Sequence, residues 1–188
     1  MAVLVELVDT PIDVARWQAA LGDSNFLPEV WPDVGAEVWL YGRTRRHTRI
    51  PTSPEQPSSV GDRRDHATGG ASVGEPPGGS VERDVSATTL RKTESLYYEA
   101  HRSMALKELR RIAGEAVEHF GVAGVVIVHR LGHVSVRQMS VAVGCGSAHR
   151  RPAIEAVAWI MDAIKRDVPI WKRETFADGR VEWVHPTG

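Results

Sequence analysis

A stretch rich in proline and glycine, from about residue 50 to residue 88, interrupts the hydrophobic pattern of this 188-residue chain. Valine supplies nearly all of its large apolar side chains, at positions 60, 73, 81 and 85. Such a segment buries too little surface to offset the entropy lost on ordering. We therefore expect a single domain spanning residues 1–188, interrupted by a long disordered insertion at about 50–88.

The N-terminal part predicts a strand, a helix and a second strand. Residues 3–8 are short, apolar and rich in valine, which favours a strand. Thr10 and Pro11 are typical of a helix start, so we expect a helix from about residue 10 to 21, ended by Gly22. Residues 35–42 are rich in β-forming residues and predict the next strand.

The C-terminal part predicts a mixture of helices and strands. Apolar residues recur at helical spacing from 101 to 119, where we expect a helix ended by Gly121, and a second helix is expected over 152–165. The pair Asp178-Gly179 predicts the turn of a final hairpin formed by residues 170–175 and 180–185. Shorter strands are expected at 122–129, 134–136 and 139–145, with a turn at Arg137-Gln138. The fold class is therefore α+β, with helices packed on a mixed or antiparallel sheet.

Composition excludes several broad classes of function. The chain has 23 Lys and Arg against 24 Asp and Glu, a net charge of -1, which disfavours a general binder of nucleic acid or membrane surfaces. No apolar run approaches the roughly 20 residues of a membrane-spanning helix, and the N-terminus lacks the pattern of a signal peptide. One cysteine cannot form an internal disulfide. We expect a cytoplasmic protein.

The C-terminal third concentrates positive side chains within apolar sequence. His149 and Arg150 precede a predicted helix, and a helix start favours anions such as phosphate. Lys165 ends that helix, and Lys172 lies on the next strand, where burial would lower its pKa. The alternative is that the first pair belongs to a solvated capping loop and that both lysines are structural.

Two further groups are candidates for a site. Arg43 and Arg45 are two residues apart on an extended segment, so they could share one side and clamp a phosphate, or they could belong to an exposed basic loop. Glu174 could orient Lys172, or it could form an ordinary surface pair. No histidine shows metal-ligand spacing, and we expect no metal site.

Cys145 and His129 have simpler interpretations. Cys145 lies on an alternating strand, which is typical of a small buried hydrophobic residue rather than of a nucleophile. His129 and Arg130 end a buried strand, and we interpret both as structural.

Taken together, five segments resemble the catalytic (large) subunit of molybdopterin synthase, the MoaE family. They occur in order over most of the chain outside the insertion, and Trp183 follows them. The segments are GAEVWLYGRTRRH at 35–47, SLYYEAHRSMA at 95–105, VIVHRLGHVSV at 126–136, GSAHRRPAIEA at 146–156 and MDAIKRDVPIWKRE at 161–174.

The resemblance implies a fold, partners and a reaction. The fold would be α+β with an α/β hammerhead-like core, and the subunit would form a homodimer. Each copy would bind a small ubiquitin-like sulfur-carrier subunit of the MoaD type, giving a heterotetramer. The carrier's C-terminal Gly-Gly thiocarboxylate would enter the pocket. The sulfurtransferase would pass two sulfurs to cyclic pyranopterin monophosphate, forming the molybdopterin dithiolene in molybdenum cofactor biosynthesis, with no cofactor of its own.

The resemblance also implies roles for individual residues. Lys165 would lie at the carrier's tail and is the first choice of catalytic group, with Lys172 as the second. The residues implied to contact substrate are Arg43, Thr44, Arg45, His149, Arg150, Lys165, Lys172, Arg173 and Glu174.

Two other functions compete with the enzyme. One is a non-catalytic scaffold that binds the ubiquitin-like carrier, which is disfavoured because His149, Arg150, Lys165 and Lys172 are all present. The other is an anion- or RNA-binding module built on the basic loop at 43–47. The near-neutral charge and the lack of an aromatic-basic stripe disfavour it.

Overall fold

The structure is a computed structural model that describes residues 2–21, 33–51 and 88–184. Contacts divide the chain into one unit of Met1–Thr48 with Arg91–Gly188 and another of Arg49–Leu90. The described residues of the second unit are the end of one strand and the beginning of the next. Most of the expected insertion, and the expected helix stop at Gly22, lie outside the described residues.

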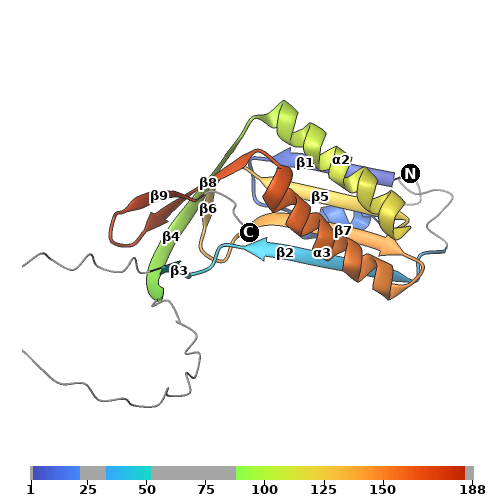
Figure 1. The fold of residues 1–188 in the computed structure, drawn as a ribbon, viewed down its shortest axis with the longest axis horizontal. Coiled ribbons are helices and arrows are strands. Elements are labelled where there is room, and N and C mark those ends of the chain that lie inside the picture. The colour runs from blue at the N-terminus through green and yellow to red at the C-terminus, as the bar shows by residue number, and fades with distance from the viewer. Residues whose placement is uncertain (1, 22–32, 52–87, 185–188) are drawn as a thin grey trace, which may run out of the picture. The chain divides into compact units, whose positions relative to one another are not determined.

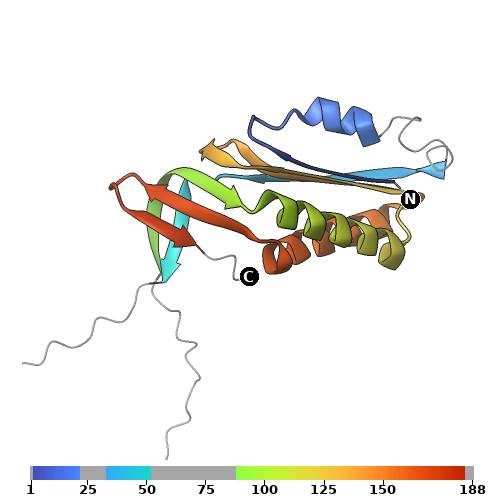
Figure 2. The same cartoon turned by 90° about the horizontal axis from the view of Figure 1, so that it is seen from above.

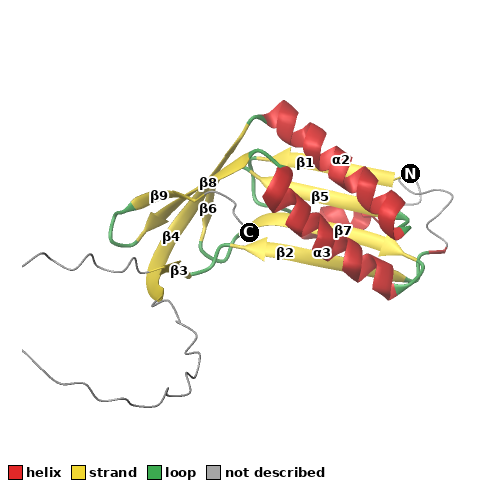
Figure 3. Ribbon diagram, in the orientation of Figure 1, coloured by secondary structure: helices red, strands yellow, loops and turns green. Residues whose placement is uncertain are grey.

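The described residues form strands and helices in mixed order, which confirms the expected α+β class (Figure 3). None of the helices in these residues is both long and apolar enough to cross a membrane. In chain order the elements are β1 (Ala2–Val8), α1 (Val14–Leu21), β2 (Ala36–Arg43), β3 (His47–Pro51), β4 (Thr88–Ala100), α2 (Arg102–Phe120), β5 (Gly124–Arg130), β6 (Gly132–Ser135), β7 (Met139–Ser147), α3 (Arg150–Asp167), β8 (Ile170–Phe176) and β9 (Val181–Val184) (Figure 1).

The first sheet is mixed and has the strand order β1-β5-β7-β2. Strand β1 runs parallel to β5, whereas β5 with β7 and β7 with β2 are antiparallel. Helices α2 and α3 cover one face and α1 covers the other (Figure 2). Because β5 is covered on both sides, its residues alternate between two cores: Val125 and Ile127 join the core that holds the side chains of α2 and α3, and Val126 and Val128 join the core that holds those of α1.

The second sheet has the order β3-β4-β8-β9, with β6 also paired to β4. Its longest strand, β4, has 13 residues, and the sequence predicted only that order resumes there. β8 and β9 form the expected final hairpin, and Gly179 takes the positive φ of 82° that the turn needs. Residue 47 begins β3, so the basic segment after β2 is shorter than the expected loop.

The ends of α1 and α2 show which residues begin and end these helices. Gly121 ends α2 with a φ of 62°, and its N–H donates to the carbonyl oxygen of Val117, as the glycine predicted. The expected start of α1 at residue 10 is wrong, because the helix begins at Val14. The Asp13 carboxylate accepts a hydrogen bond from the backbone N–H of Arg16, so Asp13 is the capping residue.

Cys145 is fully buried in the core beneath α2 and α3, and burial raises the pKa of its thiol to about 12. A thiol in this state is not a nucleophile at neutral pH. The interpretation of Cys145 as a small hydrophobic residue is confirmed.

Candidate active site

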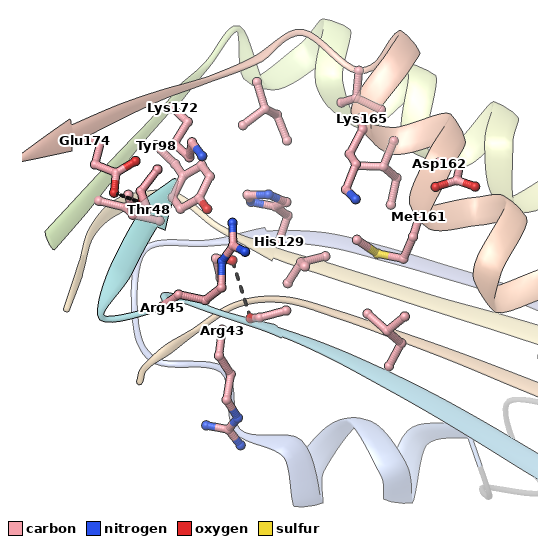
Figure 4. Close-up of a pocket in the computed structure, with 18 of the residues that line it drawn as sticks. Arg43, Arg45, Thr48, Tyr98, His129, Met161, Asp162, Lys165, Lys172 and Glu174 are labelled. Carbon is pink, nitrogen blue, oxygen red and sulfur yellow. Dashed lines mark hydrogen bonds between the residues drawn. The ribbon is translucent and has the colours of Figure 1, made fainter. Parts of the chain in front are cut away.

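A cavity of about 790 Å³ lies within the first unit, where three parts of the fold meet. Side chains of β2, β5 and β7 form its floor, on the face of the first sheet that α2 and α3 cover. The C-terminal half of α3 forms one wall, and β4 and β8 of the second sheet form another (Figure 4). Residues that line it include Leu40, Gly42, His129, Val141, Met161, Lys165, Tyr98, Lys172 and Glu174.

Three cationic side chains direct their charged groups into this cavity from different parts of the chain. Arg45 follows β2, Lys165 belongs to the last turn of α3, and Lys172 lies on β8 (Figure 4). None of the ion pairs formed by the described residues involves any of the three. Cations that converge without carboxylate partners are suited to an anionic ligand.

Lys172 is the most perturbed of these cations. Burial lowers the pKa of its ammonium group, and the charges of Arg45 and Lys165 lower it further, while Glu174 acts in the opposite direction. A lysine in this environment gives up its proton more readily than an exposed lysine. It is therefore suited to donate a proton as a general acid.

Glu174 is a buried carboxylate beside Lys172, with 1% of its surface exposed. Its Oε1 accepts hydrogen bonds from the hydroxyl groups of Thr48 on β3 and Thr93 on β4. Its Oε2 has no hydrogen-bond partner among the described residues. The two hydroxyl donors hold the carboxylate in place, and its charge partly offsets the three cations.

Arg173 does not line the cavity, contrary to the role expected for it. Side chains of a strand alternate between its two faces, so Arg173 points to the side opposite Lys172 and Glu174. There its guanidinium carbon lies 4.9 Å from the ring centroid of Tyr97 and 5.6 Å from that of Trp183. These are cation–π contacts, which give Arg173 a packing role.

Arg43 and Arg45 do not form the expected clamp. The pairing of β2 with β7 shifts register at Arg43, and the chain is no longer a strand at Arg45. Arg43 borders the cavity, but its Nη1 donates to the carbonyl oxygen of Arg137 at 3.0 Å, and its guanidinium points away from Arg45 (Figure 4). Of these two arginines, only Arg45 directs its guanidinium group towards the cavity.

Thr44, between these arginines, is 3% exposed and absent from the cavity lining. Its backbone N–H donates to Gln138, and its carbonyl oxygen accepts from Arg137. The expected turn at Arg137-Gln138 is confirmed, and Arg137 adopts a positive φ of 72° there. Thr44 therefore joins the basic segment to this turn.

His149 and Arg150 lie at the opposite end of α3 from Lys165. Fifteen residues of helix separate Arg150 from Lys165, which corresponds to a rise of roughly 22 Å. Both His149 and Arg150 are exposed, and the His149 side chain makes no capping hydrogen bond. Within one chain, His149 and Arg150 therefore lie apart from the two lysines.

Two polar aromatic rings of the cavity, those of His129 and Tyr98, were not predicted as site groups from the sequence. Their rings pack edge to face with centroids 5.1 Å apart. Burial lowers the pKa of His129 to about 4 and raises the pKa of Tyr98, so both are neutral at pH 7. The alternation of β5 could have indicated His129, because this histidine follows two aliphatic residues on the same face of the strand.

The fold and the site together define an α+β protein with a cationic cavity for a small anionic ligand. No group of three His, Cys, Asp or Glu side chains in the described residues is placed to hold a metal ion.

Comparison with known proteins identifies the family. The model of the MoaE protein family matches residues 79–167. The molybdopterin synthase catalytic subunit of Thermoplasma volcanium is 35% identical over 105 residues, which cover 56% of this chain and 74% of that protein. The corresponding protein of Emericella nidulans is 44% identical over 93 residues, which cover 50% of this chain and 48% of that protein. The chain thus spans about half the length of that relative.

A solved structure agrees with the sequence comparison. The crystal structure of molybdopterin synthase from Staphylococcus aureus superposes with a TM-score of 0.63 at 26% identity, covering 95% of each chain. The chain belongs to the MoaE family, whose characterised relatives are molybdopterin synthase catalytic subunits.

Proposed function

We propose that this chain is the catalytic subunit of a molybdopterin synthase. It would transfer sulfur from a thiocarboxylated carrier protein to cyclic pyranopterin monophosphate, forming the dithiolene of molybdopterin. The observation that carries this proposal is the convergence of Arg45, Lys165 and Lys172, without ion-pair partners among the described residues, on one cavity. The membership of the chain in the MoaE family gives that cavity its substrate class.

The charges of the cavity match those of the two reactants. The substrate carries a phosphate, and the carrier ends in an anionic thiocarboxylate. Guanidinium and ammonium groups form strong charge-assisted hydrogen bonds with both kinds of anion. Arg45 and Lys172 would hold the phosphate, and Lys165 would meet the carrier's tail.

The reaction needs charge stabilisation and proton transfer, which lysine supplies. The thiocarboxylate sulfur forms a bond to a substrate carbon, and an oxygen substituent leaves that carbon with a proton. Water then cleaves the thioester, so the carrier ends with an ordinary carboxylate and the substrate keeps the sulfur. Lys165 would stabilise the developing anion, and Lys172, whose pKa is lowered, would protonate the leaving oxygen.

A second copy of the chain would complete the site. His149 and Arg150 are exposed at the end of α3 remote from the chain's own cavity, where they are free to enter the cavity of a neighbour. We therefore include a homodimer in the proposal, with a MoaD-type carrier on each copy and a cytoplasmic location. Cation donors from a second chain would increase the affinity for the phosphate.

Reconstitution tests this function directly. The chain is mixed with a thiocarboxylated carrier and cyclic pyranopterin monophosphate, and molybdopterin is detected as its fluorescent oxidised derivative. Product that depends on this chain supports the proposal. Carrier binding without product would instead support the scaffold function, and failure to bind either the carrier or the substrate would exclude both.

A further inference from the structure

His129 is the one polar residue in a row of β5 that is otherwise aliphatic. Val125, Ile127 and His129 occupy alternate positions, so they share the face of the first sheet that α2 and α3 cover. The first two are fully buried in the core, whereas His129 reaches the cavity floor with 6% of its surface exposed. Burying a polar imidazole in this row costs more free energy than burying an aliphatic side chain, which suggests that the ring has a function.

The hydrogen bonds of the ring fix its tautomer. His129 Nδ1 lies 2.9 Å from the carbonyl oxygen of Arg130. A carbonyl oxygen only accepts hydrogen bonds, so Nδ1 must carry the hydrogen. The Tyr98 ring packs against the imidazole at an interplanar angle of 76° and restricts its rotation. In the neutral ring, Nε2 is therefore the atom that can accept a hydrogen bond.

The surroundings keep the imidazole neutral. The groups facing it are Tyr98 from β4, Lys172 from β8, Lys165 from α3 and Arg45 from the segment after β2 (Figure 4). Burial lowers the pKa of the imidazole, and this effect outweighs the hydrogen bond to Arg130, which acts in the opposite direction.

His129 adds a neutral ring acceptor to a cavity whose lining also holds the carboxylates of Glu174 and Asp162. Lysine and arginine are donors only, so the three cations can bind a phosphate but cannot bind an N–H or O–H group. One oxygen of Glu174 is engaged by two threonine hydroxyls, and the other has no partner among the described residues. A carboxylate would also repel the phosphate, whereas a neutral imidazole nitrogen accepts a hydrogen bond without adding negative charge.

We propose that His129 is a substrate-binding residue whose Nε2 accepts a hydrogen bond from an N–H or O–H group of the pyranopterin ring system. This inference rests on the proposed function and assigns the recognition of the uncharged part of that substrate. The cavity thus divides into a cationic part that binds the phosphate and a neutral part, with His129 and Tyr98, that orients the heterocycle.

Two variants of the full-length chain separate this role from packing. In His129→Asn the amide nitrogen can replace Nδ1 and keep the bond to Arg130, but nothing replaces Nε2. In His129→Gln the amide oxygen can reach the position of Nε2. Both variants lose the ring contact with Tyr98, so each controls for the packing change in the other.

The measurement is the dissociation constant of cyclic pyranopterin monophosphate, with thermal unfolding of each variant as the check on folding. We expect His129→Asn to weaken binding about tenfold, as for the loss of one hydrogen bond, and His129→Gln to recover most of the affinity. Equal affinity of wild type and His129→Asn would overturn the inference, as would equal losses in the two variants.

A spectroscopic measurement on wild type does not depend on the variants folding. With ¹⁵N-labelled histidine, saturating substrate should move the Nε2 resonance of His129 towards that of a hydrogen-bonded nitrogen and leave Nδ1 nearly unchanged. A wild-type chain that makes molybdopterin while this resonance stays fixed would contradict the role of His129 and leave the proposed function intact. A wild-type chain that does not bind the substrate at all would overturn both.

Discussion

Lys165 and Lys172 enter one cavity from two different elements, and the charge of the first helps to lower the pKa of the second. Burial is the larger cause of the shift, followed by the opposing effect of Glu174. The two lysines lie seven positions apart, and between them the chain leaves α3 and enters β8. This short connection brings both lysines to the same cavity although like charges repel each other.

The coupling between the lysines predicts a measurable pKa change. In Lys165→Gln the pKa of Lys172 should rise, because one of the cations that disfavour its protonated form is gone. The titration of the Lys172 side chain can be followed by NMR with labelled lysine. Lys107→Gln, on the exposed surface of α2, is the matched control and should leave the titration unchanged. No rise in the first variant would show that the two charges do not interact.

Lys165→Ala should abolish the proposed sulfur transfer and leave the fold intact. The side chain is exposed at the helix end, so its removal creates no core cavity. Loss of an anion-stabilising or proton-donating group costs on the order of 10²-fold to 10⁴-fold in rate. Molybdopterin formation and circular dichroism are the measurements, with Lys107→Ala as the control. Wild-type turnover in Lys165→Ala would show that Lys165 is not a catalytic residue.

Glu174→Ala should destabilise the protein by about 2–4 kcal/mol, because it opens a cavity and leaves the hydroxyls of Thr48 and Thr93 without their acceptor. Urea unfolding of the variant measures the change. Glu94→Ala, at an exposed position on β4, should change the free energy of unfolding by less than about 0.5 kcal/mol. Similar values for the two variants would mean that the buried carboxylate contributes little to stability.

His129 predicts a specific dependence of stability on pH. Its pKa is about 4 in the folded chain and 6.5 when unperturbed, so between these values only the unfolded state binds the proton. Stability should therefore fall as the pH decreases from about 6.5 to 4. The contribution of this residue between pH 7 and pH 5 is about 2 kcal/mol.

The comparison of wild type with His129→Gln isolates this effect from other titrating groups. Arg45, Lys165 and Lys172, the cations that line the same cavity, are present in both proteins, so the comparison cancels their contribution. Urea unfolding at pH 7 and pH 5 should show a smaller loss of stability in the variant. Equal losses would show that His129 is not held neutral in the folded chain.

Local signals predicted the helices and most strands because each depends on neighbouring residues. Gly121 ended α2 and Gly179 turned the last hairpin where the sequence placed them. The start of α1 was wrong because Asp13 competed with Thr10 as a cap, and its carboxylate reaches the right N–H group. The long strand β4 was not predicted because its residues are stabilised by pairing with β6 and β8, which are distant in sequence.

Site residues could be predicted where a charged side chain lies in largely apolar sequence. They could not be predicted where their position depends on tertiary packing. Lysines at positions 165 and 172 stood out against apolar neighbours. The direction of Arg43 depends on the turn at Arg137, nearly a hundred residues away, and no local pattern shows it. The place of His129 on the cavity floor depends on how far α3 extends along the first sheet.

The length of α3 predicts that two inactive variants could restore activity when they form a mixed dimer. With His149 at one end and Lys165 at the other, a shared site would draw each group from a different chain. A subunit with His149→Ala and a subunit with Lys165→Ala would then each be inactive as homodimers. When the two are mixed and allowed to exchange, the heterodimer would have one intact site and one doubly defective site. Molybdopterin formation by the mixture would amount to complementation between two defective alleles, whereas no recovery after confirmed exchange would place both groups in the same chain's site.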